Sequence, residues 1–307
     1  YGYNFQQDVV NEMTLDGETL WVSTAGRGLK AIDLKQRRIL STPPALHAQM
    51  DGMIIENNTM YVGLMGSEGS AAGFQTFDTL SRQWGFGSLI AGLPSNLVRD
   101  FLVYGDHIMI ATHGGIGMYN TTRDDWDNPI TTMDGLPSPI ITHLHSINTT
   151  IQGGGKVLAG GAAGVTVLHE SNLTVLNTLG FNDGLMGNTV SGITEAGPIS
   201  RVVQNPDGTN STLYHDAAIF ISHNGQGPTR PGVTAWDLNT DMANGSYNID
   251  RTVVVAGRKN LRIAAVDPGG AVISGGSIVR RFASPFARFM KSSKDIWIYP
   301  KLLRRSI

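Results

Sequence analysis

Two histidines and an aspartate are the residues of this sequence whose types could carry out acid–base chemistry. His143 and His145 lie two positions apart in the apolar segment PIITHLHSI, which predicts a strand with both imidazoles on one face. Asp100 occupies the place of His143 in the preceding copy of the same pattern. Imidazoles beside a carboxylate can act as general base and acid, or can bind a divalent metal ion. We therefore take these three residues as candidate catalytic residues, and a divalent metal ion as the one cofactor they could hold.

Repeated segments must position these side chains. The segment AGLPSNLVRDFLVY (91–104) matches DGLPSPIITHLHSI (134–147) at an offset of 43 residues, and DGLMGNTVSGIT (183–194) follows at an offset of 49. Each copy has a glycine turn that leads into a short apolar strand. A second apolar strand recurs at steps of 40, 48, 49, 62 and 52 residues, at Trp21, Tyr61, Met109, Leu158, Phe220 and Val272.

This spacing is typical of the four-stranded blades of a β-propeller. We expect an all-β fold with about six visible four-stranded blades over residues 1–282, which close as a six- or seven-bladed ring or form a fragment of a larger one. The unit over 190–249 is enlarged by a polar segment at 204–215, which predicts an insertion between its strands. No helical periodicity with caps extends over 12 or more residues.

The pattern of DGLPS, an apolar strand, LWVST, a glycine turn and a tyrosine resembles the two-component-regulator type of β-propeller repeat, and more loosely the streptogramin-lyase-like propellers. The resemblance covers about residues 8–282. It implies a fold shared by periplasmic sensor domains of histidine kinases, glycan-responsive modules and secreted propellers. The lyase relatives imply a histidine-centred, magnesium-dependent elimination, but no local motif here matches their active site.

Four further residues are candidates for ligand binding. In a propeller, the innermost strands line a central tunnel, and Glu12 occupies the repeat position of Asp100 in the first unit. His113 and His223 fall in or beside turns that we expect at the same rim. Trp126 could stack on a sugar ring if exposed there. The alternative is that the polar residues only face water or bond to turns, and that the tryptophans pack between blades, as large aromatic side chains commonly do.

Composition and charge exclude several classes of site and partner. The 307 residues include no cysteine, which excludes disulfides, thiolate metal sites and cysteine nucleophiles. Residues 1–279 carry a net charge of −9, so we expect no nucleic acid as a partner. No apolar run reaches the length of a transmembrane helix. The acidic segment DDWD, with Asp124, Asp125 and Asp127, could hold calcium, although a solvated turn is the simpler interpretation.

Six N-x-Ser/Thr acceptor sequences suggest an extracellular, cell-surface or periplasmic protein. They begin at Asn57, Asn120, Asn148, Asn172, Asn210 and Asn244.

The last 28 residues differ from the rest. Residues 280–307 carry a net charge of +7, and no glycine follows Gly276. We expect 283–307 to form a basic, aromatic tail that docks on the propeller.

Two function classes follow from these observations. The first is an extracellular or periplasmic recognition module that binds a glycan, a peptide or a small molecule at the tunnel rim, as part of a larger surface or sensor protein. The alternative is a secreted hydrolase or lyase acting on an ester, a lactone or a uronic-acid polysaccharide, with His143 or His145 as the base and Asp100 or a metal stabilising the developing charge.

Overall fold

The computed structural model describes fourteen stretches of the chain, and it divides the chain into two compact units, Tyr1–Ser146 and Ile147–Ile307. The described stretches are 9–64, 73–85, 91–147, 155–169, 171–185, 187–196, 199–204, 210–215, 218–224, 232–237, 251–253, 263–266, 271–274 and 279–281. The tail expected at 283–307 lies outside them.

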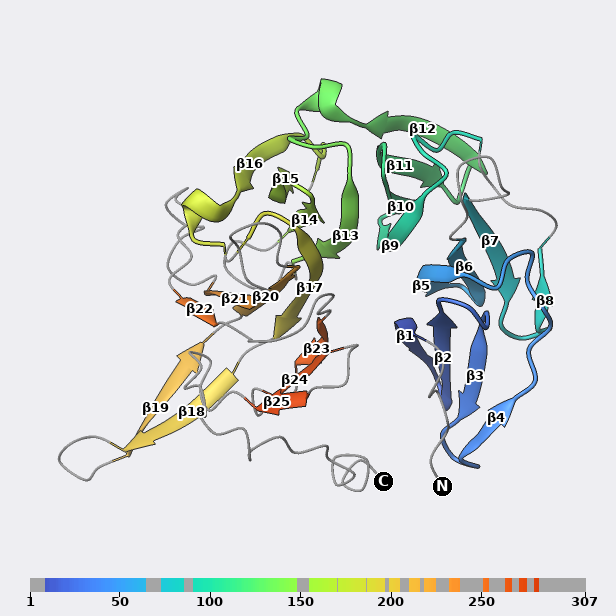
Figure 1. Cartoon of the computed structure of the whole chain (residues 1–307), viewed down its shortest axis with the longest axis horizontal. Helices are drawn as coiled ribbons and strands as arrows, with labels where there is room; N and C mark the ends of the chain where they lie inside the picture. Colours follow the sequence, from blue (N-terminus) through green and yellow to red (C-terminus); the bar gives the residue numbers. More distant parts are fainter. Residues whose placement is uncertain are drawn as a thin grey trace. The chain divides into compact units, whose positions relative to one another are not determined.

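Short antiparallel strands make up almost all of the regular structure in these stretches (Figure 1). Three sheets in the first unit have consecutive strand order. The first contains β1 (Val10–Asp16), β2 (Thr19–Thr24), β3 (Lys30–Asp33) and β4 (Arg38–Leu40). The second contains β5 (Met50–Glu56), β6 (Thr59–Leu64), β7 (Gly73–Asp78) and β8 (Gln83–Trp84). The third contains β9 (Val98–Tyr104), β10 (His107–Thr112), β11 (Gly115–Asn120) and β12 (Asp125–Ile130).

Two further four-stranded sheets follow. One has the order β13 (Ile141–Ser146), β14 (Lys156–Gly161), β15 (Gly164–His169) and β16 (Val175–Leu179). The other has the order β17 (Val190–Ala196), β20 (Ala218–His223), β21 (Gly232–Asp237) and β22 (Arg251–Val253). The fold is all-β, and its sheets are the blades of a β-propeller.

The expected number of blades is wrong. The described residues form five four-stranded blades rather than six or seven. Around Val272 the described residues form three strands: β23 (Ile263–Val266), β24 (Ala271–Ser274) and β25 (Val279–Arg281). The residues that mark the repeat nevertheless all lie in the second strand of their sheet, from Trp21 in β2 to Val272 in β24. The predicted positions of the second strands are therefore correct. The prediction of four strands in the last unit is not matched by its described residues, which form three.

The insertion in the fifth blade is confirmed. The strands β18 (Ile199–Gln204) and β19 (Asn210–His215) form a separate two-stranded sheet between β17 and β20. The inner strand β17 consequently pairs with β20.

Rows of apolar side chains across the sheets bind neighbouring blades of the first unit together. In the second blade, Ile55, Met60, Phe77 and Trp84 lie in one cross-strand row. This row packs in one cluster with Trp21 of the first blade, and the rings of Trp21 and Phe77 meet edge to face at 5.3 Å between centroids. Strands this short cannot bury both faces alone, so stacking supplies the core.

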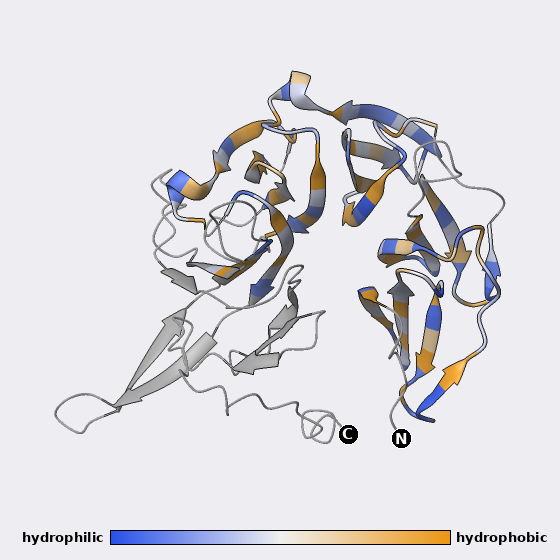
Figure 2. Ribbon diagram, viewed as in Figure 1, coloured by the Kyte–Doolittle hydropathy of each residue, from blue (hydrophilic) through white to orange (hydrophobic). Residues whose placement is uncertain are grey.

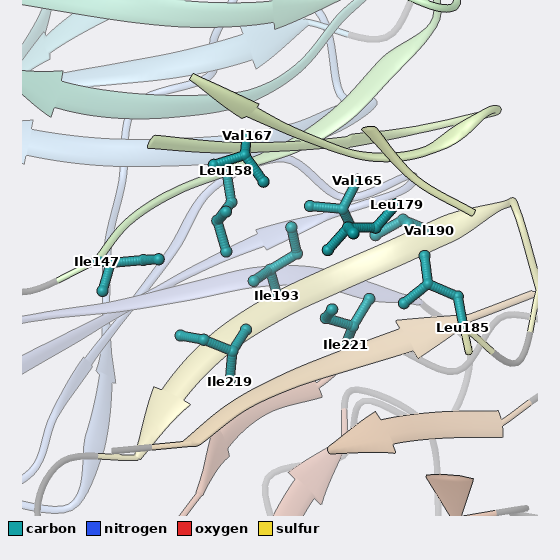
Figure 3. Close-up of a cluster of buried hydrophobic side chains, with 10 residues drawn as sticks. All are labelled: Ile147, Leu158, Val165, Val167, Leu179, Leu185, Val190, Ile193, Ile219 and Ile221. Carbon is teal, nitrogen blue, oxygen red and sulfur yellow. The ribbon is translucent and has the colours of Figure 1, made fainter. Parts of the chain in front are cut away.

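The second unit has a core of aliphatic residues. Figure 3 shows the ten buried side chains, which include Leu158 of β14, Val167 of β15, Ile193 of β17 and Ile221 of β20. The same strands show apolar and polar residues interspersed in Figure 2.

The repeated DGL sequence has a structural explanation. Asp134 accepts hydrogen bonds from the backbone N–H and hydroxyl of Thr131 and so caps the short 3₁₀ turn η1 (Thr132–Asp134). Gly135 follows with φ of 100°, a left-handed conformation that favours glycine, and Leu136 is buried. The turn η2 (Phe181–Asp183) repeats this arrangement before Leu185. The motif therefore fixes the entry into the next inner strand.

Candidate functional site

The first strand of a blade carries a β-bulge close to its beginning. The register shifts there in β1, β5, β9 and β17. A bulge adds one residue to one strand and re-aims the side chains around it. Each of these bulges contains a polar residue: Asn11 in β1, Asp51 in β5, Arg99 in β9 and Ser191 in β17.

Asp100 and His143 meet across two neighbouring inner strands, β9 and β13. The Oδ2 atom of Asp100 lies 2.7 Å from Nδ1 of His143 and also accepts a hydrogen bond of 2.9 Å from the backbone N–H of Leu144. The other oxygen, Oδ1, accepts a hydrogen bond of 2.8 Å from the N–H of Phe101. The side chain of Asp100 is 8% exposed and that of His143 is 20% exposed. The carboxylate therefore fixes the orientation of the imidazole and links the two strands.

An ion pair joins β9 to the preceding inner strand, β5. The Nη1 atom of Arg99 lies 2.9 Å from Oδ2 of Asp51, whose side chain is completely buried. The backbone oxygen of Asp51 accepts a hydrogen bond of 2.6 Å from the hydroxyl of Ser23 in β2. Arg99 and Asp100 are adjacent in β9. The strand β9 therefore contacts both neighbouring inner strands, β5 through Arg99 and β13 through Asp100.

The first blade connects to the second through a neutral contact. Asn11 Nδ2 donates a hydrogen bond of 2.6 Å to the backbone oxygen of Met50. Glu12, the candidate at the repeat position of Asp100, lies in β1, and its carboxylate accepts a hydrogen bond of 3.2 Å from the N–H of Met13. The second blade has Gly52 at this repeat position.

His113 lies close to the Asp51–Arg99 pair. It directly follows β10, and its backbone N–H donates a hydrogen bond of 3.2 Å to the oxygen of Leu97. Burial lowers the pKa of His113 below its ordinary 6.5, and the charge of Arg99 lowers this pKa further, while Asp51 raises it. The imidazole is therefore neutral at neutral pH and can donate or accept a hydrogen bond without carrying charge.

The other sequence candidates have different surroundings. His145 lies half-buried in β13, two residues after His143. Trp126 is also half-buried and packs with the aromatic cluster of the second and third blades, 6.2 Å from the ring of Phe74 and 5.2 Å from that of Tyr119. This position agrees with the packing interpretation of the tryptophans rather than with a stacking surface.

His223 is fully buried rather than exposed at a rim. It is the last residue of β20, and its Nε2 atom lies 3.0 Å from the hydroxyl of Thr234 in β21. Burial lowers its pKa to about 4, against a smaller raising effect of a hydrogen bond to the backbone of Gly187. A neutral imidazole in the core has a structural role, because no ligand reaches it without opening the blade.

The sequence interpretation missed Asp51 and Arg99. Both were visible as charged residues inside apolar inner strands, in the segments QMDGM and LVRDF, at the same repeat position. Adjacent residues in a regular strand point to opposite faces, so the pattern alone does not place Arg99 and Asp100 on the same side of the strand. The bulge in this region changes that alternation.

The carboxylates of the acidic segment in the third blade bond to nearby side chains. Asp127 contacts Nε2 of His107 at 2.7 Å and Arg123 at 2.5 Å, and Asp124 accepts a hydrogen bond from the hydroxyl of Tyr119. The His107 and Arg123 bonds lower the pKa of Asp127. The described residues contain no group of three or more histidine, aspartate or glutamate side chains that could hold a metal ion.

In the part of the chain that the structure describes, no helix is long and apolar enough to cross a membrane. No family model matches the chain. No curated protein matches it significantly.

Solved structures show the fold of the chain. Two extracellular domains of hybrid two-component systems from B. thetaiotaomicron are 14% identical to it. The first has a TM-score of 0.58, and the match covers 96% of this chain and 35% of the neighbour's chain. The second has a TM-score of 0.54, and the match covers 90% of this chain and 40% of the neighbour's chain. This chain therefore spans little more than a third of theirs. A chain of the mitotic checkpoint complex, 11% identical, has a TM-score of 0.60 over 89% of this chain and 73% of its own. At such identities the likeness establishes the propeller fold alone, which serves unrelated functions.

Proposed function

We propose that this protein is a ligand-recognition propeller of an extracellular or periplasmic protein, and that it forms part of a larger surface or sensor protein. It binds a glycan or a peptide at the blade ends where the inner strands begin. The observation that carries the proposal is the placement of two side-chain pairs, Asp51–Arg99 and Asp100–His143, along three successive inner strands. The likeness to extracellular domains of two-component systems supports the location.

The chemistry of the pairs suits such ligands. A guanidinium offers several N–H donors in a fixed plane, and an imidazole held at Nδ1 by a carboxylate presents Nε2 in a defined orientation. Hydroxyl and carbonyl groups of sugars and peptides are matching partners. Because the carboxylates hold Arg99 and His143 in place before a ligand arrives, binding loses little side-chain entropy.

A glycan array and a peptide library, screened with the full chain, test this function. Arg99→Gln and His143→Gln should each weaken the binding that the screen finds by about tenfold, which corresponds to about 1.4 kcal/mol. Lys35→Gln is the matched control, because Lys35 forms only an exposed pair with Glu18 at 3.7 Å. Absence of any binding, or equal affinity of all three variants, would contradict the proposal.

A second candidate function is a hydrolase or lyase that acts on an ester, a lactone or a uronic-acid polysaccharide. The contact of 2.7 Å between Asp100 and His143 favours it, because a carboxylate that holds Nδ1–H leaves the lone pair on Nε2, as in a general base. Turnover of such substrates that disappears in His143→Gln, and persists in His145→Gln and Lys35→Gln, would favour this function over simple recognition.

A further inference from the structure

The six acceptor sequences for N-linked glycans differ in how the folded chain presents them. The structure describes the side chains of three of these asparagines: Asn57, Asn120 and Asn172. All three lie in the same sequence context, N-x-Thr, so the sequence does not distinguish them. Their surroundings do.

The carboxamide of Asn120 is part of the interior of the third blade. The residue is 3% exposed and ends β11. Its Nδ2 atom donates a hydrogen bond of 2.9 Å to Oδ2 of Asp106. Its Oδ1 atom accepts hydrogen bonds of 3.0 and 2.9 Å from the backbone N–H groups of Thr122 and Arg123. Attaching a sugar to Nδ2 would require these bonds to break and the turn between β11 and β12 to open.

Asn57 and Asn172 lie in exposed turns. Asn57 begins the two-residue turn between β5 and β6, where it and Asn58 have positive φ angles of 49° and 64°, and its Nδ2 atom donates a hydrogen bond to Glu56. Asn172 lies between β15 and β16, and its Oδ1 atom accepts hydrogen bonds from both the N–H and the hydroxyl of Thr174, at 3.1 and 2.8 Å. This arrangement holds the side chain by its oxygen at the surface.

These asparagines also lie away from the candidate ligand-binding residues of their own blades. Asn57 follows the end of β5, whereas Asp51 lies at its beginning, so about 20 Å of extended strand separates them at about 3.3 Å per residue. The turn that holds Asn172 connects the third and fourth strands of its blade. A glycan on Asn57 would therefore leave the beginning of β5 uncovered, a consequence that matters only if the proposed function holds.

We infer that Asn57 and Asn172 are glycan acceptors in the folded protein and that Asn120 is not. The co-reactant is an oligosaccharide linked to a polyprenyl diphosphate. The amide nitrogen Nδ2 forms a bond to C1 of the first sugar, the bond from C1 to the diphosphate oxygen breaks, the diphosphate leaves with the electron pair, and Nδ2 loses one proton.

The folded, full-length chain is incubated with an oligosaccharyltransferase and a polyprenyl-diphosphate-linked oligosaccharide, and the occupancy of each asparagine is measured by mass spectrometry of peptides. Occupancy at Asn57 and at Asn172 should exceed that at Asn120 by at least about tenfold. A synthetic peptide of residues 116–126 controls for sequence preference, and it should be modified at Asn120 because it has no fold. Thr59→Ala and Thr174→Ala should each remove one site, whereas Thr59→Ser and Thr174→Ser should keep it.

Equal occupancy of Asn120 in the folded chain would overturn the inference. So would an unmodified Asn57 or Asn172 when synthetic peptides around these residues are modified. Thermal unfolding of each variant shows that it is folded before its occupancy is interpreted. None of these outcomes depends on ligand binding, so the inference can fail while the proposed function holds.

Discussion

At the residue scale, Asp100 connects the stability of the propeller to its candidate site. One buried carboxylate accepts two backbone hydrogen bonds and contacts His143. Asp100→Ala leaves these donors without their acceptor and should lower the free energy of unfolding by about 3 kcal/mol or more, whereas Asp100→Asn keeps one oxygen and should cost about half as much. Urea unfolding measures both. The control is Asp33→Ala, which removes a single exposed bond to Gln36 and should cost under about 1 kcal/mol. Equal losses for Asp100→Ala and Asp33→Ala would contradict this role.

His223 makes the stability of the chain depend on pH. Its pKa is about 4 in the folded state and about 6.5 in an unfolded chain. Well above pH 6.5 neither the folded nor the unfolded state binds the proton, so the free energy of unfolding is not reduced by His223. Between about pH 6.5 and pH 4 only the unfolded state binds it, so the free energy of unfolding falls as the pH falls, by about 3 kcal/mol in total.

The comparison of wild type with His223→Gln isolates this effect from the carboxylates, which titrate in both proteins. Urea unfolding at pH 7.5 and at pH 4.5 should show a smaller loss of stability in the variant. The same loss in both proteins would show that His223 does not remain neutral in the fold.

The sequence predicted part of the candidate site, and the reason lies in the repeat. Asp100 and His143 share one repeat position, and neighbouring copies place equivalent residues on adjacent strands, so their proximity followed from alignment alone. The burial of His223 could not be predicted from the repeat alignment, because it depends on the packing of β20 between β17 and β21. Arg99 was missed because the bulge breaks the simple alternation of side chains along β9.

At the element scale, Gly52 allows the inner strands β5 and β9 to approach each other. A Cβ atom on Gly52 would lie 2.6 Å from both the backbone oxygen of Arg99 and the Cα of Asp100. Gly52→Ala should therefore push the strands apart and lower the free energy of unfolding by about 2–3 kcal/mol.

The matched control is Gly17→Ala, since nothing lies within 4 Å of a Cβ there and only its positive φ of 56° opposes the change. We expect it to cost about 1 kcal/mol. Thermal and urea unfolding check both variants. A Gly52→Ala variant as stable as the control would mean that the close approach is not needed.

Turns explain why the elements were largely predictable. Glycine and aspartate mark the turns before the inner strands, and the second strand recurs in every unit, at steps of 40 to 62 residues. Strand number in the last unit was not predictable in the same way, because pairing of short strands depends on neighbours rather than on local pattern. The hairpin of β18 and β19 was visible as a polar insertion, but its pairing as a separate sheet was not.

At the scale of the whole molecule, the fold alone does not select a function, since its structural neighbours include both extracellular domains of hybrid two-component systems and a chain of the mitotic checkpoint complex. The proposed function therefore depends on the polar residues of the inner strands. If recognition takes place there, a bound ligand must change the surroundings of His143, and it must leave the buried His223 unaffected.

Nuclear magnetic resonance of the histidine ring nitrogens, during titration with the tightest-binding glycan or peptide of the screen, tests this claim most directly. We expect the ring signals of His143 to shift and to saturate at the ligand concentration given by the affinity, while those of His223 stay in place. Saturation of the protein by ligand with unchanged His143 signals would contradict the account.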